Sequence, residues 1–129
     1  MLKGSATTTM DRWGRIKIPS DFLKTFKEKF GNEVFVTSTD DRNIQIYPLA
    51  AWFKLVDNLH KGKRDDLLLR KFLIKTNYNG SKARVDKYGR VQIPGFIMKK
   101  IGLEGKINIE GREDHLELIP TWMRGDWRQ

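Results

Sequence analysis

The sequence predicts a mainly β fold with helices, built from two repeats that share one core. The first observation is a duplicated stretch: residues 11–19 read DRWGRIKIP and residues 86–94 read DKYGRVQIP. This recurrence at one fixed offset indicates a duplicated structural unit. The second observation is the length of 129 residues, which leaves each repeat too small to be stable alone, with no cysteine to form a disulfide. The two halves are therefore expected to pack on each other.

The duplicated stretch predicts two strands joined by a tight turn. In the first copy, threonine-rich residues 5–11 favour a strand, and Gly14 suits the positive φ of the following turn. Residues 15–18 alternate basic and apolar side chains, so Ile16 and Ile18 should face a core. The basic side chains of this strand should then face outward together.

The rest of the first repeat, residues 1–48, predicts a helix and a hairpin. Ser20 is the predicted N-cap of the helix and Gly31 lies at its C-terminal end. Strands are expected over 33–37 and 44–47, joined by a polar turn. The first repeat therefore reads as strand, turn, strand, helix and hairpin.

Residues 49–80 form a helical connection between the repeats. Apolar residues around Trp52 recur at helical spacing, and a second helical run covers residues 65–75. The aromatic and leucine side chains here should contact a core or another subunit. The basic break between the helices, at Lys61, Lys63 and Arg64, reads as a solvated loop, with phosphate contact as the alternative.

The second repeat, residues 81–129, should retrace the first. The expected elements are strands over 81–86 and 90–93, a helix over 96–101, and a hairpin over 106–110 and 116–119. The tail beyond it, which carries Trp122 and Trp127, is expected to dock as the middle helices do.

The charge favours a polyanionic partner such as nucleic acid or an acidic membrane surface. The formal net charge is +9, and residues 3–18 and 81–93 each hold four basic residues against one acidic residue. No run of apolar residues is long enough for a membrane span, and the N-terminus lacks the apolar region of a secretory signal. The sequence therefore predicts a soluble, cytoplasmic protein without a membrane partner, in which the two hairpins hold most of the excess positive charge.

Strand parity places the basic residues of the two hairpins on matching faces. That face holds Thr7, Thr9, Arg15 and Lys17 in the first copy, and Lys82, Arg84, Arg90 and Gln92 in the second. Basic β-ribbons can enter a DNA groove, where arginine bonds guanine and lysine neutralises phosphate. The candidate DNA-binding residues are Arg12, Arg15, Lys17, Lys82, Arg84, Lys87 and Arg90.

Two features have structural readings beside the functional ones. Asp11 with Arg15, and Asp86 with Arg90, could be ion pairs across the turn or could orient an arginine that reads a base. The turn residues Trp13 and Tyr88 could pack on the neighbouring half or subunit, or could stack or insert at a DNA surface. The spacing alone leaves both pairs of alternatives open.

The doubled D-x-x-G-R-[hydrophobic]-x-[hydrophobic]-P motif resembles the MraZ family, bacterial relatives of AbrB-type regulators. The leading MLKGSATTTMD, Tyr47-Pro48-Leu49 followed by Trp52, and the run RKF at residues 70–72 extend the resemblance over nearly the whole chain. It implies a double-split, swapped-hairpin β-barrel made of two AbrB-like repeats with peripheral helices.

The resemblance also implies a function. Members of the family form homo-oligomeric rings, such as an octamer or a dodecamer, and bind short G-rich direct repeats in double-stranded DNA upstream of the division and cell-wall gene cluster. The family's DNA-contacting arginines fall on Arg15 and Arg90, with Asp11, Asp86, Gly14 and Gly89 shaping the loops. A nucleoid-associated transcriptional regulator, either repressor or activator, is the expectation.

Two other classes of function fit the sequence less well. An AbrB-like antitoxin or partner-binding module would usually carry one hairpin unit and a long disordered tail, which this chain does not show. An enzyme is not expected, because no phosphate loop, nucleophile elbow or metal pattern appears, and His60 and His115 fall at a helix end and in a turn. No catalytic residue, metal or cofactor is therefore predicted.

Overall fold

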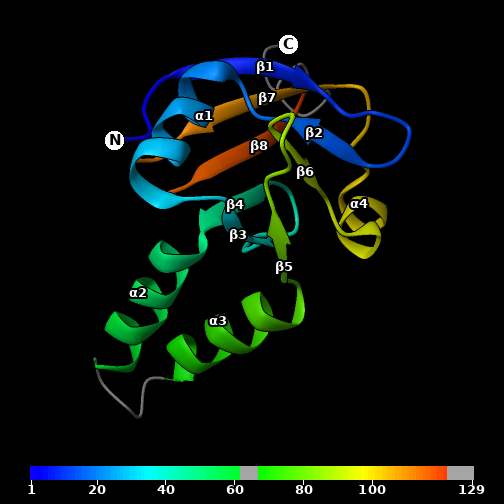
Figure 1. Cartoon of the computed structure of the whole chain (residues 1–129). Helices are drawn as coiled ribbons and strands as arrows, with labels where there is room; N and C mark the ends of the chain where they lie inside the picture. Colours follow the sequence, from blue (N-terminus) through cyan, green and yellow to red (C-terminus); the bar gives the residue numbers. More distant parts are fainter. Residues whose placement is uncertain (62–66, 122–129) are drawn as a thin grey trace.

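The computed structural model describes residues 1–61 and 67–121, which form a six-stranded antiparallel sheet and a two-stranded ladder with helices around them (Figure 1). In spatial order the strands of the sheet are β1 (Ser5–Thr9), β7 (Lys106–Gly111), β8 (Leu116–Pro120), β4 (Ile44–Pro48), β3 (Glu33–Thr37) and β5 (Ser81–Arg84). The ladder consists of β2 (Arg15–Lys17) and β6 (Arg90–Gln92). The prediction of a mainly β fold with helices is confirmed.

Strands of the two repeats pair with each other. β1 pairs with β7 of the second repeat, β5 pairs with β3 of the first, and β2 pairs with β6. This is the swapped pairing that the resemblance implies. Among the described residues no ladder joins β1 directly to β5, but β1 contacts β2 and β5 contacts β6. The β2–β6 ladder therefore lies beside both edges of the large sheet.

One cluster of buried apolar side chains serves both repeats. Ile16, Ile18, Val91 and Ile93 are each fully buried in it, as the alternation along the two short strands predicts. Burying a side chain of this size is worth about 1.5–3 kcal/mol. Because the four come from both halves, each repeat supplies part of the core that stabilises the other.

The N-cap of the first helix lies one residue before the position that the sequence predicts. α1 (Ser20–Thr25) continues into a π-helical turn, η1 (Phe26–Phe30), and its N-cap is Pro19. The prediction that Ser20 is the N-cap is wrong, because the Pro19 carbonyl already accepts the first helical bond, from the Leu23 N–H at 2.9 Å. Proline fixes φ near −65°, which suits this entry to a helix.

The second repeat has a shorter helix in the equivalent place. α4 (Gly95–Ile101) follows Pro94 and ends at Gly102, whose φ is 72°. In the first repeat η1 ends at Gly31, with φ 84°. The prediction that a glycine ends the first helix is confirmed, since a positive φ at this position favours a residue without a side chain.

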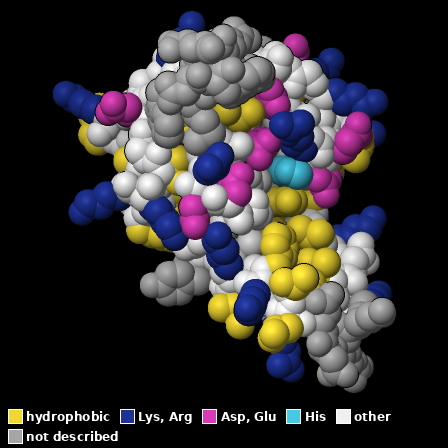
Figure 2. Space-filling view, turned by 180° about the vertical axis from the view of Figure 1, so that it is seen from behind, with side chains coloured by type: hydrophobic (Ala, Val, Ile, Leu, Met, Phe, Trp, Pro, Cys, Tyr) yellow, Lys and Arg dark blue, Asp and Glu magenta, His cyan; other side chains and the backbone are white. Residues whose placement is uncertain are grey.

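Helices α2 (Leu49–His60) and α3 (Leu67–Tyr78) form an arm that extends away from the sheet (Figure 1). A second apolar cluster attaches the arm: the Trp52 ring stacks on Phe35 of β3 with 4.5 Å between centroids. Figure 2 shows hydrophobic side chains gathered on the lower part of the molecule, where the arm lies. No helix in the described part of the chain is long and apolar enough to cross a membrane.

Some expectations fall on residues that the structure does not describe. The helical run was expected from residue 65, and α3 is described from Leu67 onward. The predictions for Lys63, Arg64, Trp122 and Trp127 concern residues outside the described ranges.

Candidate nucleic-acid interface

The first repeated loop, loop 1 (residues 11–14), is a tight turn closed by its own aspartate. Asp11 Oδ1 accepts the backbone N–H groups of Trp13 and Arg15, both at 2.9 Å. The Asp11 carbonyl accepts the Gly14 N–H at 3.1 Å, and Gly14 has φ 80°. A short side-chain acceptor at the start of a turn and a glycine at its end are what this geometry requires.

The second repeated loop, loop 2 (residues 86–89), reproduces this geometry. Asp86 Oδ1 accepts the N–H groups of Tyr88 and Arg90, both at 2.9 Å. The Gly89 N–H donates to the Asp86 carbonyl at 3.0 Å, and φ at Gly89 is 78°. Aspartate and glycine therefore shape both loops in the same way.

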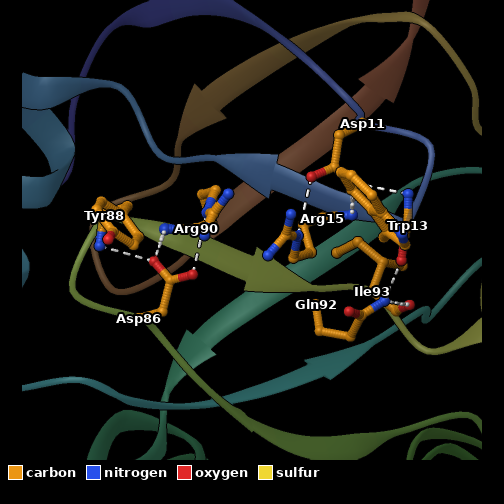
Figure 3. Close-up of polar contacts among 8 residues, drawn as sticks. All are labelled: Asp11, Trp13, Arg15, Asp86, Tyr88, Arg90, Gln92 and Ile93. Atoms are coloured by element: carbon orange, nitrogen blue, oxygen red, sulfur yellow. Dashed lines mark hydrogen bonds and ion pairs between the residues drawn. The ribbon is translucent and has the colours of Figure 1, made fainter.

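Each aspartate also holds the arginine of its motif. Arg15 Nε lies 2.9 Å from Asp11 Oδ2, and Arg90 Nε lies 3.0 Å from Asp86 Oδ2 (Figure 3). The two arginine side chains are 27% and 29% exposed, so both are partly buried. The ion pair across the turn is thus present in both copies. In each pair the aspartate contacts Nε, and the two terminal nitrogens of the guanidinium are not part of this contact.

The pKa of both aspartates lies below the ordinary value of 3.8. For Asp11, burial raises the pKa, but hydrogen bonds from the backbone and side chain of Arg15 and from the Trp13 backbone outweigh it. For Asp86, the backbone hydrogen bond from Arg90 is the largest cause. Both carboxylates are therefore ionised at neutral pH and bind their arginines as anions.

The β2–β6 ladder brings the two arginines together on one face. Arg15 lies opposite Gln92 and Lys17 lies opposite Arg90. Arg15 and Arg90 are therefore diagonal neighbours, about 7–8 Å apart at the backbone. Figure 3 shows them between the two loops, with Asp11 and Asp86 on the outer sides.

Each loop is also held by the other repeat. Gln92 Nε2 donates to the Trp13 carbonyl at 2.7 Å, and Lys17 Nζ donates to the Tyr88 carbonyl. Lys17 and Gln92 occupy the same place in the two copies, which gives the contact a two-fold character. Sequence reasoning missed this role and assigned Lys17 to DNA alone. The signal that could have found it is a long donor at the same position of both repeats.

Trp13 and Tyr88 stand at the tips of the loops. Their side chains are 58% and 57% exposed in this chain, so the interpretation that they pack on the neighbouring half is wrong, while packing on a neighbouring subunit stays a prediction. Trp13 instead lies beside Arg15, with Cζ 5.0 Å from the ring centroid, and Tyr88 beside Arg90 at 4.9 Å.

Two further candidates stand at the loop tips. The Arg12 Cζ lies 4.3 Å from the Trp13 ring, and the Lys87 Nζ lies 5.1 Å from the Tyr88 ring. Each ring therefore has cations from the residue before it and from the motif arginine. Together with the ladder, the loops form a basic face around Arg15 and Arg90.

The candidates on β5 lie apart from this arrangement. Lys82 lies over the Phe53 ring of α2 at 5.8 Å, and Arg84 pairs with Glu33 at 3.3 Å. Arg84 and Lys87 border a hollow of about 690 Å³ beside loop 2, which Phe26 also lines. Within the described ranges, no three His, Asp or Glu side chains lie close enough to hold a metal ion.

The sequence of the chain matches a family model and several known proteins. Residues 1–73 match the sequence model of a family described as "MraZ protein, putative antitoxin-like". A transcriptional regulator MraZ of Acidobacterium capsulatum is 32% identical over 118 residues, covering 92% of this chain and 81% of that protein. The transcriptional regulator MraZ of Koribacter versatilis is 31% identical, covering 86% and 76%. That of Neisseria meningitidis serogroup A is 28% identical, covering 98% and 83%.

One solved structure is also similar. The solution structure of PHS018 from Pyrococcus horikoshii has a TM-score of 0.39 and 17% identity, and covers 92% of this chain and 89% of that chain. A likeness of this size supports no conclusion about fold or function.

Proposed function

Because the chain belongs to the MraZ family, we propose that it is a transcriptional regulator that binds double-stranded DNA through the face of the β2–β6 ladder. One observation carries this proposal: Arg15 and Arg90 lie on one accessible face, each held by its loop aspartate through Nε. The terminal nitrogens of a guanidinium that is held through Nε can still donate hydrogen bonds to a partner. The relatives named as transcriptional regulators support DNA as that partner.

The geometry suits base reading in the major groove. A guanidinium can donate two parallel hydrogen bonds to O6 and N7 of guanine, and a two-stranded ribbon fits the groove of about 12 Å. The backbone spacing of Arg15 and Arg90, about 7–8 Å, is close to two base steps of about 3.4 Å each. The face would therefore contact two guanines about two steps apart. Arg12 and Lys87, at the loop tips, are suited to the flanking phosphates.

Single arginine variants test this proposal. Arg15→Ala and Arg90→Ala should each weaken binding to a promoter fragment by about 1–3 kcal/mol, roughly 5- to 150-fold, and reduce the preference over scrambled DNA. Fluorescence anisotropy against salt measures both. Arg42→Ala is the charge-matched control, since Arg42 is exposed in the turn between β3 and β4. Arginine variants that bind like Arg42→Ala would exclude this face as the reader.

The target follows from the family. We propose that the protein acts in the cytoplasm, on the nucleoid, at short G-rich direct repeats upstream of the division and cell-wall gene cluster. The support is the resemblance of the doubled motif together with the family match. Footprinting that upstream region should reveal evenly spaced protected repeats. Protection of unrelated sequence to the same extent would contradict the target.

We also propose that copies of the chain assemble into a ring, such as an octamer or a dodecamer, through the arm of α2 and α3. The arm exposes large apolar side chains, which on a surface mark interaction sites. These are Phe53, Leu67, Leu68 and Ile74, 54% to 77% exposed. A ring would present several copies of the reading face to spaced repeats, and this multivalency would raise the affinity.

Sedimentation tests the assembly. The variant Leu67→Glu combined with Ile74→Glu should sediment as a smaller species than the wild type, because charges on the arm oppose its burial. Phe96→Glu is the matched control, since Phe96 is 51% exposed on α4, outside the arm. An arm variant that sediments like the wild type would show that the copies meet elsewhere.

A second candidate function rests on the family description, which calls these proteins antitoxin-like. In that case the chain would bind a small toxin and DNA binding would be secondary. Purification from the native host distinguishes the two. A small partner present in stoichiometric amount would favour this candidate, and purification of the chain alone would favour the regulator.

A further inference from the structure

We propose that Trp13 and Tyr88 are positioning residues: the face of each ring holds the motif arginine two residues later in the orientation that reads a base. The inference rests on the proposed DNA binding for its ligand. Its first test needs no DNA, so the two can fail separately.

The arginines are constrained from two sides. The loop aspartate binds Nε at 2.9 Å in the first copy and 3.0 Å in the second. An aromatic ring contacts each guanidinium as well: the Cζ of Arg15 lies 5.0 Å from the Trp13 ring centroid, and that of Arg90 lies 4.9 Å from the Tyr88 centroid. Both distances are within the roughly 6 Å over which a cation and a ring attract each other. Carboxylate and ring together fix the long side chain before a ligand arrives.

Equivalence between the copies separates this contact from coincidence. The two positions hold different aromatic residues, tryptophan and tyrosine, yet the ring-to-guanidinium distances agree within 0.1 Å. Size and hydrogen-bonding groups differ between these residues, and the π face is what they share. Both rings are also more than half exposed, so burial does not account for an aromatic residue at either site.

An arginine fixed in advance favours specific over general binding. Ordering a flexible side chain on binding costs free energy, and a side chain ordered beforehand avoids part of that cost. The terminal nitrogens must also meet a base edge at the correct angle, whereas a phosphate accepts many angles. Loss of the ring should therefore reduce the preference for the correct sequence more than the overall attraction to DNA.

The competing role for an exposed aromatic is a wedge inserted between base steps. Wedges are apolar side chains such as phenylalanine, leucine, isoleucine and methionine, so their action depends on bulk and not on a π face. Trp13→Leu keeps apolar bulk and removes the ring. Trp13→Phe keeps a ring. These two variants distinguish positioning from insertion.

The first test measures the reactivity of the arginines in the free protein. A dicarbonyl reagent such as phenylglyoxal modifies accessible guanidinium groups, and mass spectrometry gives the rate at each site for an assembly of any size. In Trp13→Leu the rate at Arg15 should rise about 2- to 5-fold, the Boltzmann factor of an exposed cation–π contact. The rate at Arg90, in the unchanged loop, is the internal control. Trp13→Phe should restore the wild-type rate at Arg15. An unchanged rate at Arg15 in Trp13→Leu overturns the proposal.

The second test measures DNA. Trp13→Leu should lower the ratio of affinities for promoter and scrambled DNA by about 2- to 5-fold, with the salt dependence unchanged because no phosphate contact is lost. Trp13→Phe should recover the ratio, and Phe96→Leu, an exposed aromatic outside the loops, should not alter it. If Trp13→Leu keeps the full ratio while Trp13→Ala loses it, the ring is a wedge and positioning is refuted. If the wild type does not bind DNA, the proposed function fails while the reactivity result still decides the arginine contact.

Discussion

Replacing Gly14 by alanine tests how strictly loop 1 requires a residue without a side chain. Gly14 has φ 80°, a region that costs an L-residue about 1–2 kcal/mol. The added Cβ would lie 2.7 Å from Met98 Sδ and 3.1 Å from Gln92 Nε2. Both atoms lie near the ends of flexible side chains and can move, but Gln92 would then release the Trp13 carbonyl, a bond worth about 0.5–1.5 kcal/mol. The expected loss of stability is therefore about 1.5–3.5 kcal/mol.

Urea unfolding at one fixed protein concentration measures this loss, since assembly makes stability depend on concentration. Gly102→Ala is a matched control: φ is 72°, but nothing lies within 4 Å of the added Cβ, so about 1–2 kcal/mol is expected from the backbone alone. At Gly95, where a Cβ also meets nothing, alanine should cost no stability. If Gly14→Ala unfolds like Gly95→Ala, the account of loop 1 is refuted. If it unfolds like Gly102→Ala, the contact between the repeats contributes nothing.

Three further predictions concern pH and the core. The pKa of Asp11 and Asp86 lies below 3.8 in the folded state, so the stability that their ionised forms contribute is complete above pH 3.8 and is lost as the pH falls through the lower folded value. A variant with Asn at both positions should therefore lose stability less steeply in acid. An unchanged acid slope of the unfolding free energy would contradict this. Burial, together with the negative charges of Asp114 and Glu117, raises the pKa of Tyr47 to about 12. The free energy of unfolding should therefore fall as the pH rises from 10 towards 12, and Tyr47→Phe should abolish that fall in urea titrations at alkaline pH. Phe26 is 1% exposed, so Phe26→Ala should cost about 3–5 kcal/mol in urea unfolding; a loss below about 1 kcal/mol would mean the site is not packed as described.

The parts of the fold that could be predicted from the sequence depend on patterns among neighbouring residues. Alternation along residues 15–18 and 90–93 depends on the two-residue period of a strand, and it correctly assigns Ile16, Ile18, Val91 and Ile93 to the core. The strand Glu33–Thr37 has the predicted bounds because turn residues flank it on both sides. The aspartate and glycine of each loop follow from turn chemistry in the same way.

Non-local geometry accounts for what sequence could not predict. Strand pairing across the repeats brings Gln92 to the Trp13 carbonyl, although they are 79 positions apart. Lys17 is turned towards loop 2 by the same pairing, so its charge could not be assigned from its strand alone. The stacking of Trp52 on Phe35 likewise depends on where the arm meets the sheet. The pattern of capping residues predicts Ser20 as the N-cap because it does not reveal that the carbonyl of the preceding proline accepts the first helical hydrogen bond.

The central claim is that the face of the β2–β6 ladder reads DNA through two arginines, one from each repeat. A footprint of the wild type and of the Arg15→Ala, Arg90→Ala double variant on the upstream region of the chain's own operon tests it most directly. The account predicts that the wild type protects evenly spaced short repeats and that the double variant, at the same concentration and with the same unfolding curve, protects none of them. The same pattern of protection from both proteins would contradict it.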